Sequence, residues 1–114
     1  MRTARIFSSL LLGVTLLASM MAAQSREGLR AVEGTVYSDS GEKVNGAIVQ
    51  LKDMKTLQIR SFITREEGKF LFQGIRRSTE YELKAKHGDK ESKSQVLTIF
   101  DDRQRATVDL KLEK

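Results

Sequence analysis

Residues that could carry acid–base chemistry are few in this 114-residue chain. His87 is its single histidine, and Asp89 follows it across Gly88. A histidine beside a carboxylate can act as a general base. The chain has no cysteine, so it offers neither a Cys–His nucleophile pair nor a thiolate ligand for zinc. The Gly-Asp spacing favours a solvent-facing turn, and we expect no catalytic residue, no metal site and no cofactor.

Acidic residues could instead bind calcium, and they occur in three sets. The sets are Asp39 with Glu42, Glu66 with Glu67, and Asp101 with Asp102. Calcium takes about six to eight oxygen ligands converging on one point. Each set supplies only a pair of carboxylates and has a basic neighbour, so we interpret all three as solvated turns.

Basic residues gather in one part of the sequence, where they would suit an anionic glycan or cell-surface polymer. They are Arg76, Arg77, Lys84, Lys86, Lys90 and Lys93. Glu82 and Glu91 interrupt them, which is more typical of one wet face of a sheet. The net charge of the whole chain is a modest +5, and we expect no nucleic-acid binding.

The N-terminal segment has the pattern of a secretory signal peptide. Arg2 and Arg5 precede an apolar run at residues 10–17, which ends in small residues. We expect cleavage near Ala23 or Ser25 and a secreted or periplasmic product with no stable membrane span. An uncleaved membrane anchor is the alternative, although serine, threonine and glycine dilute the run.

Three parts follow from this reading: a signal peptide (residues 1–23), a short lead (24–30) and one domain (31–114). Within the domain, residues 47–52, 81–86 and 106–112 alternate apolar with polar side chains. Such alternation is typical of half-buried strands in an antiparallel sheet. The other expected strands are residues 31–37, 57–63, 69–73 and 95–100. The sequence therefore predicts an all-β fold, a seven-stranded antiparallel β-sandwich preceded by a signal-peptide helix.

Turn and core residues support this fold. Gly34 would let a neighbouring strand or side chain approach closely. Gly68 would close the turn that directs Phe70 and Phe72 into the core, and Tyr81 would bury its ring with its hydroxyl near a backbone partner. The remaining turn glycines of this set are Gly41, Gly46 and Gly74.

The stretches at residues 32–41, 44–51, 64–72 and 81–85, with Gly74 and Ile75, resemble the carboxypeptidase regulatory-like domain. This family has a prealbumin-like (transthyretin-like) sandwich fold. The resemblance implies a small, standalone bacterial secreted member, and it is specific for fold rather than for a ligand.

Two activities of similar sandwiches do not fit this chain. Hydroxyisourate hydrolase relies on several histidines and a C-terminal Tyr-Arg-Gly-Ser, and the chain has neither. A Lys–Asn isopeptide crosslink would need Asn45, the sole asparagine, which we expect in a turn.

Three apolar residues, Ile48, Phe62 and Leu71, fall on the phase opposite to the core residues of their strands. Facing outward together, they would form an interaction patch for a partner. Bulges or a curled edge would instead direct them into the core. The chain has no proline, so protection of the sheet edges is left to charged residues such as Lys84, Lys86, Lys90 and Lys93.

The function expected from the sequence is therefore a non-catalytic exported module for protein interaction or scaffolding at the bacterial cell envelope. The partner would be an unknown envelope protein or a glycan. The alternative is a carbohydrate-binding module of the starch-binding-like type. Sugar platforms need exposed aromatic rings, and we expect most of the few rings here in the core.

Overall fold

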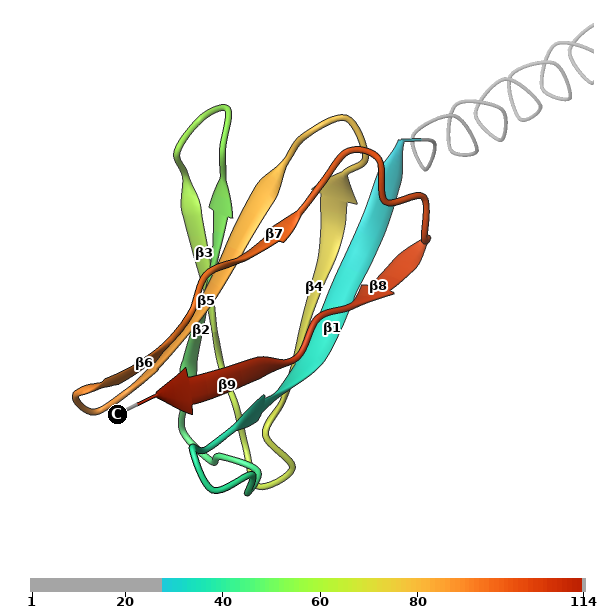
Figure 1. Ribbon diagram of the computed structural model, residues 1–114. Coiled ribbons are helices and arrows are strands. Elements are labelled where there is room, and N and C mark those ends of the chain that lie inside the picture. The colour runs from blue at the N-terminus through green and yellow to red at the C-terminus, as the bar shows by residue number, and fades with distance from the viewer. Residues whose placement is uncertain (1–27, 114) are drawn as a thin grey trace, which may run out of the picture.

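Nine β-strands and no helix make up residues 28–113, the part of the chain that this computed structural model describes (Figure 1). The first five are β1 (Leu29–Tyr37), β2 (Ile48–Asp53), β3 (Ile59–Ile63), β4 (Lys69–Arg76) and β5 (Tyr81–His87). The last four are β6 (Lys90–Ser92), β7 (Gln95–Leu97), β8 (Arg105–Thr107) and β9 (Leu110–Glu113). The all-β fold class is confirmed, whereas the predicted signal peptide lies outside the described residues. Within residues 28–113 no helix has the length and hydropathy needed to cross a membrane.

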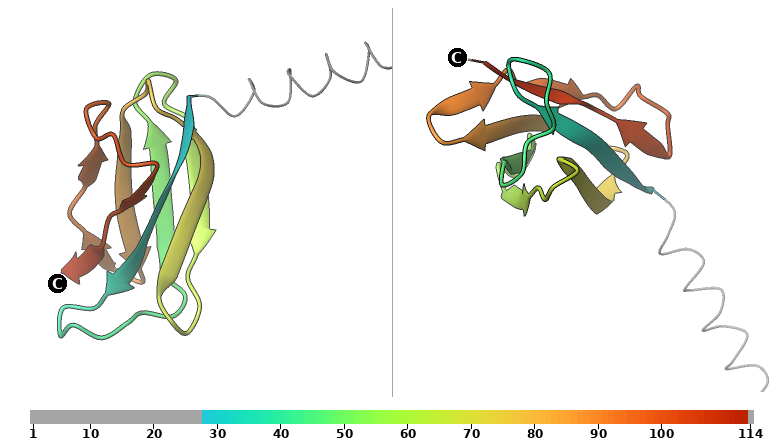
Figure 2. Two further views of the ribbon diagram at one scale, coloured as in Figure 1. Left: turned by 90° about the vertical axis from the view of Figure 1, so that its right-hand side faces the viewer. Right: turned by 90° about the horizontal axis from the view of Figure 1, so that it is seen from below.

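The strands form one continuous hydrogen-bonded path, in the order β3-β2-β5-β6-β9-β1-β4, and the path wraps around a common core. β7 pairs with β5 and β8 with β1 beside this path. One layer contains β2, β3, β5 and β7, and the facing layer contains β1, β4 and β8. β6 and β9 join the two layers along one side (Figure 2). The path ends at β3 and β4, which each have a free edge, and the short strands β7 and β8 also pair on one side only.

Alternation along the strands sends every second side chain into the space between the layers. In β1 the buried residues include Val32 and Val36, and in β5 they include Leu83 and Ala85. Phe70 and Phe72 reach the same core from β4, with ring centroids 6.1 Å apart. The alternation read from the sequence thus places the core correctly.

The expected set of seven antiparallel strands is wrong in two respects. There are nine strands, and β1 runs parallel to both β8 and β9. Residues 106–112, expected as one strand, are split: Val108 donates its N–H to Glu33 O at 2.8 Å, and the Asp109 carboxylate accepts the N–H of Thr35 at 3.0 Å. Alternation reports which side chains are buried. It carries no information about strand direction or about a break that a neighbouring strand imposes.

Gly34 lies at that break. A Cβ atom at this position would lie 1.8 Å from the carbonyl oxygen of Val108 and 2.8 Å from Phe70. The close approach expected at Gly34 is therefore present, because only a residue without a side chain lets the β8–β9 junction cross β1.

Two strands are shorter than expected. β3 begins at Ile59 rather than at residue 57, because Leu57 has a φ of 65° and ends a tight loop that the Asp53 carboxylate organises. β7 ends at Leu97, and residues 98–104 leave the sheet as a loop. The bounds expected from the sequence are too long because apolar residues continue from these strands into the adjoining loops.

Candidate functional site

An arginine whose side chain points from β1 into the core organises the loop after β7. Arg30 shares the inward phase of Val32, and its side chain is fully buried. Its guanidinium donates one hydrogen bond to the Thr98 carbonyl at 2.9 Å and another to the Asp101 carbonyl. A buried charge is costly unless it is hydrogen-bonded. The carbonyl groups of residues 98–101 supply those bonds and are held in place by them.

Further bonds close a turn within the loop and fix its C-terminal end to β1. Asp101 donates its N–H to Thr98 O at 3.3 Å, which closes a turn. Gln104 accepts the N–H of Ala31 on its carbonyl at 3.0 Å and donates its side-chain amide to Leu29 O at 2.9 Å. The loop is therefore positioned by hydrogen bonds, most of them to its backbone, rather than by packing of its apolar side chains.

Ile99 and Phe100 lie between the two carbonyls that Arg30 binds, and they point outward. Ile99 is 51% exposed and Phe100 is 88% exposed. We refer to these two residues as the apolar tip. A large aromatic ring so exposed is unusual, because burial of such a side chain stabilises a protein by about 1.5–3 kcal/mol. The tip therefore presents apolar surface to whatever lies beside this end of the domain.

Charged residues surround the base of the tip. The Arg103 side chain bonds the Asp101 carboxylate at 2.6 Å, and this hydrogen bond lowers the pKa of Asp101 to about 2. Arg77 bonds Asp102 O at 3.5 Å, and Arg105 pairs with Glu33 at 3.1 Å. A hollow of about 400 Å³ lies beside the base, lined in part by Leu29, Arg30, Gly74 and Gln104. The tip thus has an apolar end and a polar, charged rim, as the buried centre and rim of a protein interface do.

A family model described as the carboxypeptidase regulatory-like domain matches residues 31–113, nearly all of the part just described. This chain belongs to that family. The resemblance read from the sequence is confirmed, and the match supports a non-catalytic β-sandwich module. A sequence search of curated proteins gave no match.

Solved structures similar to this regulatory-like domain include chlorocatechol 1,2-dioxygenase from Pseudomonas putida. Its TM-score is 0.58 at 13% identity, covering 77% of this chain and 62% of that one. S.CueP has a TM-score of 0.56 at 18% identity, with 75% and 62% covered. The dioxygenase domain of a carbohydrate-binding fusion from Streptomyces sp. SirexAA-E has a TM-score of 0.55 at 14% identity, with 78% and 82% covered. The chain thus spans 62% of the first two neighbours, and at these identities the likeness shows the fold alone.

Ile48, Phe62 and Leu71, considered either as an outward interaction patch or as core residues, do not lie together in the regulatory-like domain. Ile48 faces outward from β2 and is 42% exposed. Phe62 points inward against the core, with its ring 6.2 Å from that of Phe72. Leu71 pairs with Glu33 in the facing layer. The three residues lie on different surfaces because β2 and β3 belong to one layer and β4 to the other.

The remaining residues singled out in the sequence lie in turns or in the core. Phe70, Phe72 and Tyr81 are buried, and the Tyr81 hydroxyl accepts the N–H of Arg76 at 3.0 Å. Gly74 has a φ of 67° and forms a bulge in β4, where the register with β1 shifts. The turn glycines Gly41, Gly46 and Gly68 also have positive φ.

The candidate catalytic and metal-binding residues remain apart. His87 is exposed at the end of β5, in the hairpin to β6. Within residues 28–113 no group of three or more His, Cys, Asp or Glu side chains is placed to hold a metal. Asp39 pairs with Lys90, Glu67 with Lys43 and Asp101 with Arg103.

The basic cluster is largely neutralised by neighbouring carboxylates. Lys84 and Lys86 both contact Glu91, at 2.9 and 3.7 Å, and Lys93 contacts Glu113 at 3.7 Å. Their arrangement therefore does not favour one positively charged face to which an anionic glycan or polymer could bind.

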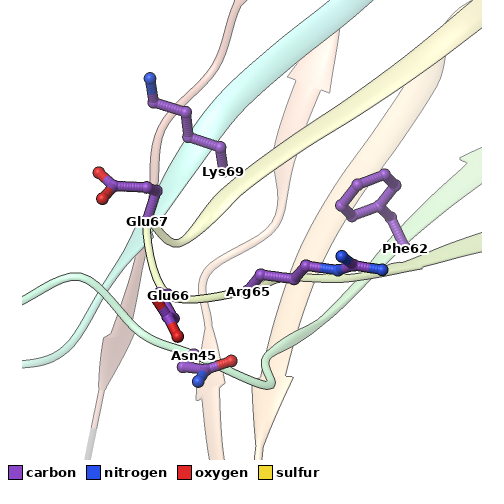
Figure 3. Close-up of a pocket in the computed structure, with 6 residues that line it drawn as sticks. All are labelled: Asn45, Phe62, Arg65, Glu66, Glu67 and Lys69. Atoms are coloured by element: carbon purple, nitrogen blue, oxygen red, sulfur yellow. The ribbon is translucent and has the colours of Figure 1, made fainter.

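A second hollow, of about 580 Å³, opens beside the turn between β3 and β4 (Figure 3). Asn45 and Glu66 lie on one side of it, Glu67 and Lys69 on the other, and Arg65 extends toward Phe62 (Figure 3). The charged side chains that line it are of both signs, and Arg65, Glu66 and Glu67 follow one another in a single turn. This hollow carries no arrangement with an identifiable chemistry.

The sequence does not reveal the apolar tip, because residues 95–100 are expected as one strand, which puts Phe100 in the sheet rather than in a loop. The signal that could have found it is Arg30. Arg30 alternates with the apolar residues Val32 and Val36 on the inward face of β1. A charged residue at such a position requires a buried polar partner from elsewhere in the chain.

Proposed function

We propose that this chain is an exported, non-catalytic β-sandwich module that binds a protein at the bacterial cell envelope through its apolar tip. The observation that carries the proposal is the fixed position of Ile99 and Phe100. Arg30 holds the turn from inside the fold, so little conformational entropy is lost when the tip enters a pocket. Aromatic side chains are also enriched in the buried centres of protein interfaces.

Export supports the envelope as the place of action. The signal-peptide pattern at residues 1–23 would carry the domain out of the cytoplasm, with cleavage near Ala23 or Ser25. A family of non-catalytic sandwiches suits a role in which the fold presents a surface rather than performs a reaction.

The test is site-specific photo-crosslinking in cells of the organism that encodes the chain. A photoreactive phenylalanine analogue at position 100 should give a discrete adduct with an envelope protein. The same analogue at position 57, where Leu57 is an exposed apolar residue outside the tip and outside β3, serves as the matched control. Identical adduct patterns from both positions, or none from position 100, would exclude a binding role for the tip.

A carbohydrate is the second candidate ligand, and the exposed ring of Phe100 is the observation that favours it. Sugar rings stack on exposed aromatic faces, but one isolated ring offers a small platform. Binding on a glycan array that disappears in Phe100→Ser and persists in Leu57→Asn, an exposed site outside the tip and outside β3, would favour this reading over a protein partner.

A further inference from the structure

The edge strand β3 has no neighbour beyond it in the sheet order. Its ladder with β2 includes Asp53 N–H donating to Gln58 O at 2.9 Å and Thr64 N–H donating to Ala47 O, also at 2.9 Å. Successive residues of an antiparallel strand bond to opposite sides. Since residues 58 and 64 bond toward β2, the odd-numbered residues of β3 direct their N–H and C=O groups away from it. These residues are Ile59, Ser61 and Ile63.

The side chains of the same three residues face solvent. Ile59 is 55% exposed and Ile63 is 64% exposed, and Ser61 between them is also exposed. The alternate residues turn inward toward β4: Arg60 donates to Gln73 O at 3.0 Å and lies 5.6 Å from the Phe72 ring centroid. The strand thus presents unpaired backbone groups beside an apolar outer row.

Nothing on β3 protects this edge. Natural sheets block free edges with lysine, proline, bulges or a covering segment. The lysines expected to do so, Lys84, Lys86 and Lys90, lie on β5 and β6 in the middle of the sheet path. At the other end of the path, β4 contains the Gly74 bulge, and its Gln73 carbonyl already accepts a hydrogen bond from Arg60. β7 and β8 also pair on one side only, but each is just three residues long, and short edge strands are themselves a form of protection. β3 is therefore the longest free edge without such protection.

The sequence of β3 is complementary to itself when reversed. In an antiparallel pair centred on Ser61, Ile59 of one copy lies opposite Ile63 of the other, so apolar side chains meet on the outer face. Arg60, the one charge of the strand, then lies opposite Phe62 rather than opposite its own copy. All three outward-bonding residues fall in hydrogen-bonded pairs, which is the pairing that their free N–H and C=O groups require.

We propose that β3 is a self-association edge, through which a second copy of this chain pairs antiparallel about Ser61 with two-fold symmetry. Ile48, which lies opposite Ile63 within one chain, extends the apolar row across the joined sheet. A contact limited to one short strand buries less than the roughly 1,000 Å² typical of stable interfaces. The dimer therefore dissociates on dilution, with an affinity in the micromolar to millimolar range.

The experiment uses the absence of cysteine from the chain. In the proposed pair the two Ser61 Cα atoms are about 5.5 Å apart, within the range that a disulfide spans. Under mild oxidation, purified exported Ser61→Cys should form a covalent dimer about tenfold faster or more than Ser94→Cys, an exposed serine outside β3. Adding Ile59→Lys to Ser61→Cys should abolish the difference with an unchanged circular-dichroism spectrum.

Equal crosslinking rates for the two cysteine variants would overturn the proposal. Light scattering of the wild-type protein that shows only monomer up to millimolar concentration would also overturn it. The result is independent of partner binding by the apolar tip, because neither Ser61 nor Ile59 belongs to the tip. Photo-crosslinking from position 100 can therefore succeed or fail separately.

Discussion

Single residues decide how the loop after β7 is held, and Arg30 is the most important of them. Its guanidinium bonds two backbone carbonyls, Thr98 O and Asp101 O, which do not titrate. Asp101 adds a second tie through its carboxylate, which bonds both the backbone and the side chain of Arg103. The loop thus combines a pH-independent attachment with one that depends on an ionised carboxylate.

The titration of Asp101 tests this second attachment. The Arg103 hydrogen bonds lower the pKa of Asp101 from 3.8 to about 2, so the stabilisation they provide is complete above the ordinary value. It is lost as the pH falls from about 4 through about 2. NMR titration of the carboxyl should give a midpoint near 2, and Arg103→Gln should return it toward 3.8.

Arg105→Gln is the matched control, because Arg105 pairs with Glu33 and not with Asp101. A midpoint that stays low in Arg103→Gln, or that rises equally in Arg105→Gln, would assign the low pKa to another cause.

At the scale of elements, the junction between β8 and β9 depends on Gly34 in β1. Val108 bonds Glu33 across this point, and its carbonyl occupies the space that a Cβ atom at Gly34 would need. The junction in turn places β8 and β9 parallel to β1 on either side of the break. One missing side chain therefore decides how the C-terminal strands cross the first strand.

Gly34→Ala should destabilise the domain by about 3 kcal/mol or more, because backbone atoms of Val108 must move to relieve the overlap. Chemical denaturation followed by circular dichroism measures the free energy of unfolding. Gly41→Ala is the control: its Cβ atom would meet nothing within 4 Å, so only the cost of its φ of 90° applies. That cost is about 1 kcal/mol. Similar losses in both variants would mean that steric contact with Val108 is unimportant.

At the scale of the whole molecule, residues 28–113 form a single sheet path wrapped around one core, and β9 connects its two layers. This last strand joins β6 of one layer to β1 of the other. Leu110 and Leu112 of β9 are almost completely buried between the layers. The fold thus needs its C-terminal strand both for hydrogen bonding and for the core.

Leu112→Ala should lower the free energy of unfolding by about 2–5 kcal/mol through the cavity it leaves. Lys111→Ala, on the exposed face of the same strand, should change it by less than about 0.5 kcal/mol. Thermal or denaturant unfolding of the two variants provides the measurement. Equal effects would show that β9 stabilises the domain through its backbone bonds alone.

The sequence by itself determined the all-β class, the family and the buried face of most strands, because side-chain alternation is a local property that every strand carries. Contacts between distant segments were decided only in the tertiary structure. They include the parallel course of β8 and β9, the split at Val108 and the bond between Arg30 and a loop about seventy residues later. The same tertiary contacts determine that Phe62 points inward and Phe100 outward. Alternation specifies a face within one strand, whereas partners, strand direction and free edges depend on how the whole chain closes on itself.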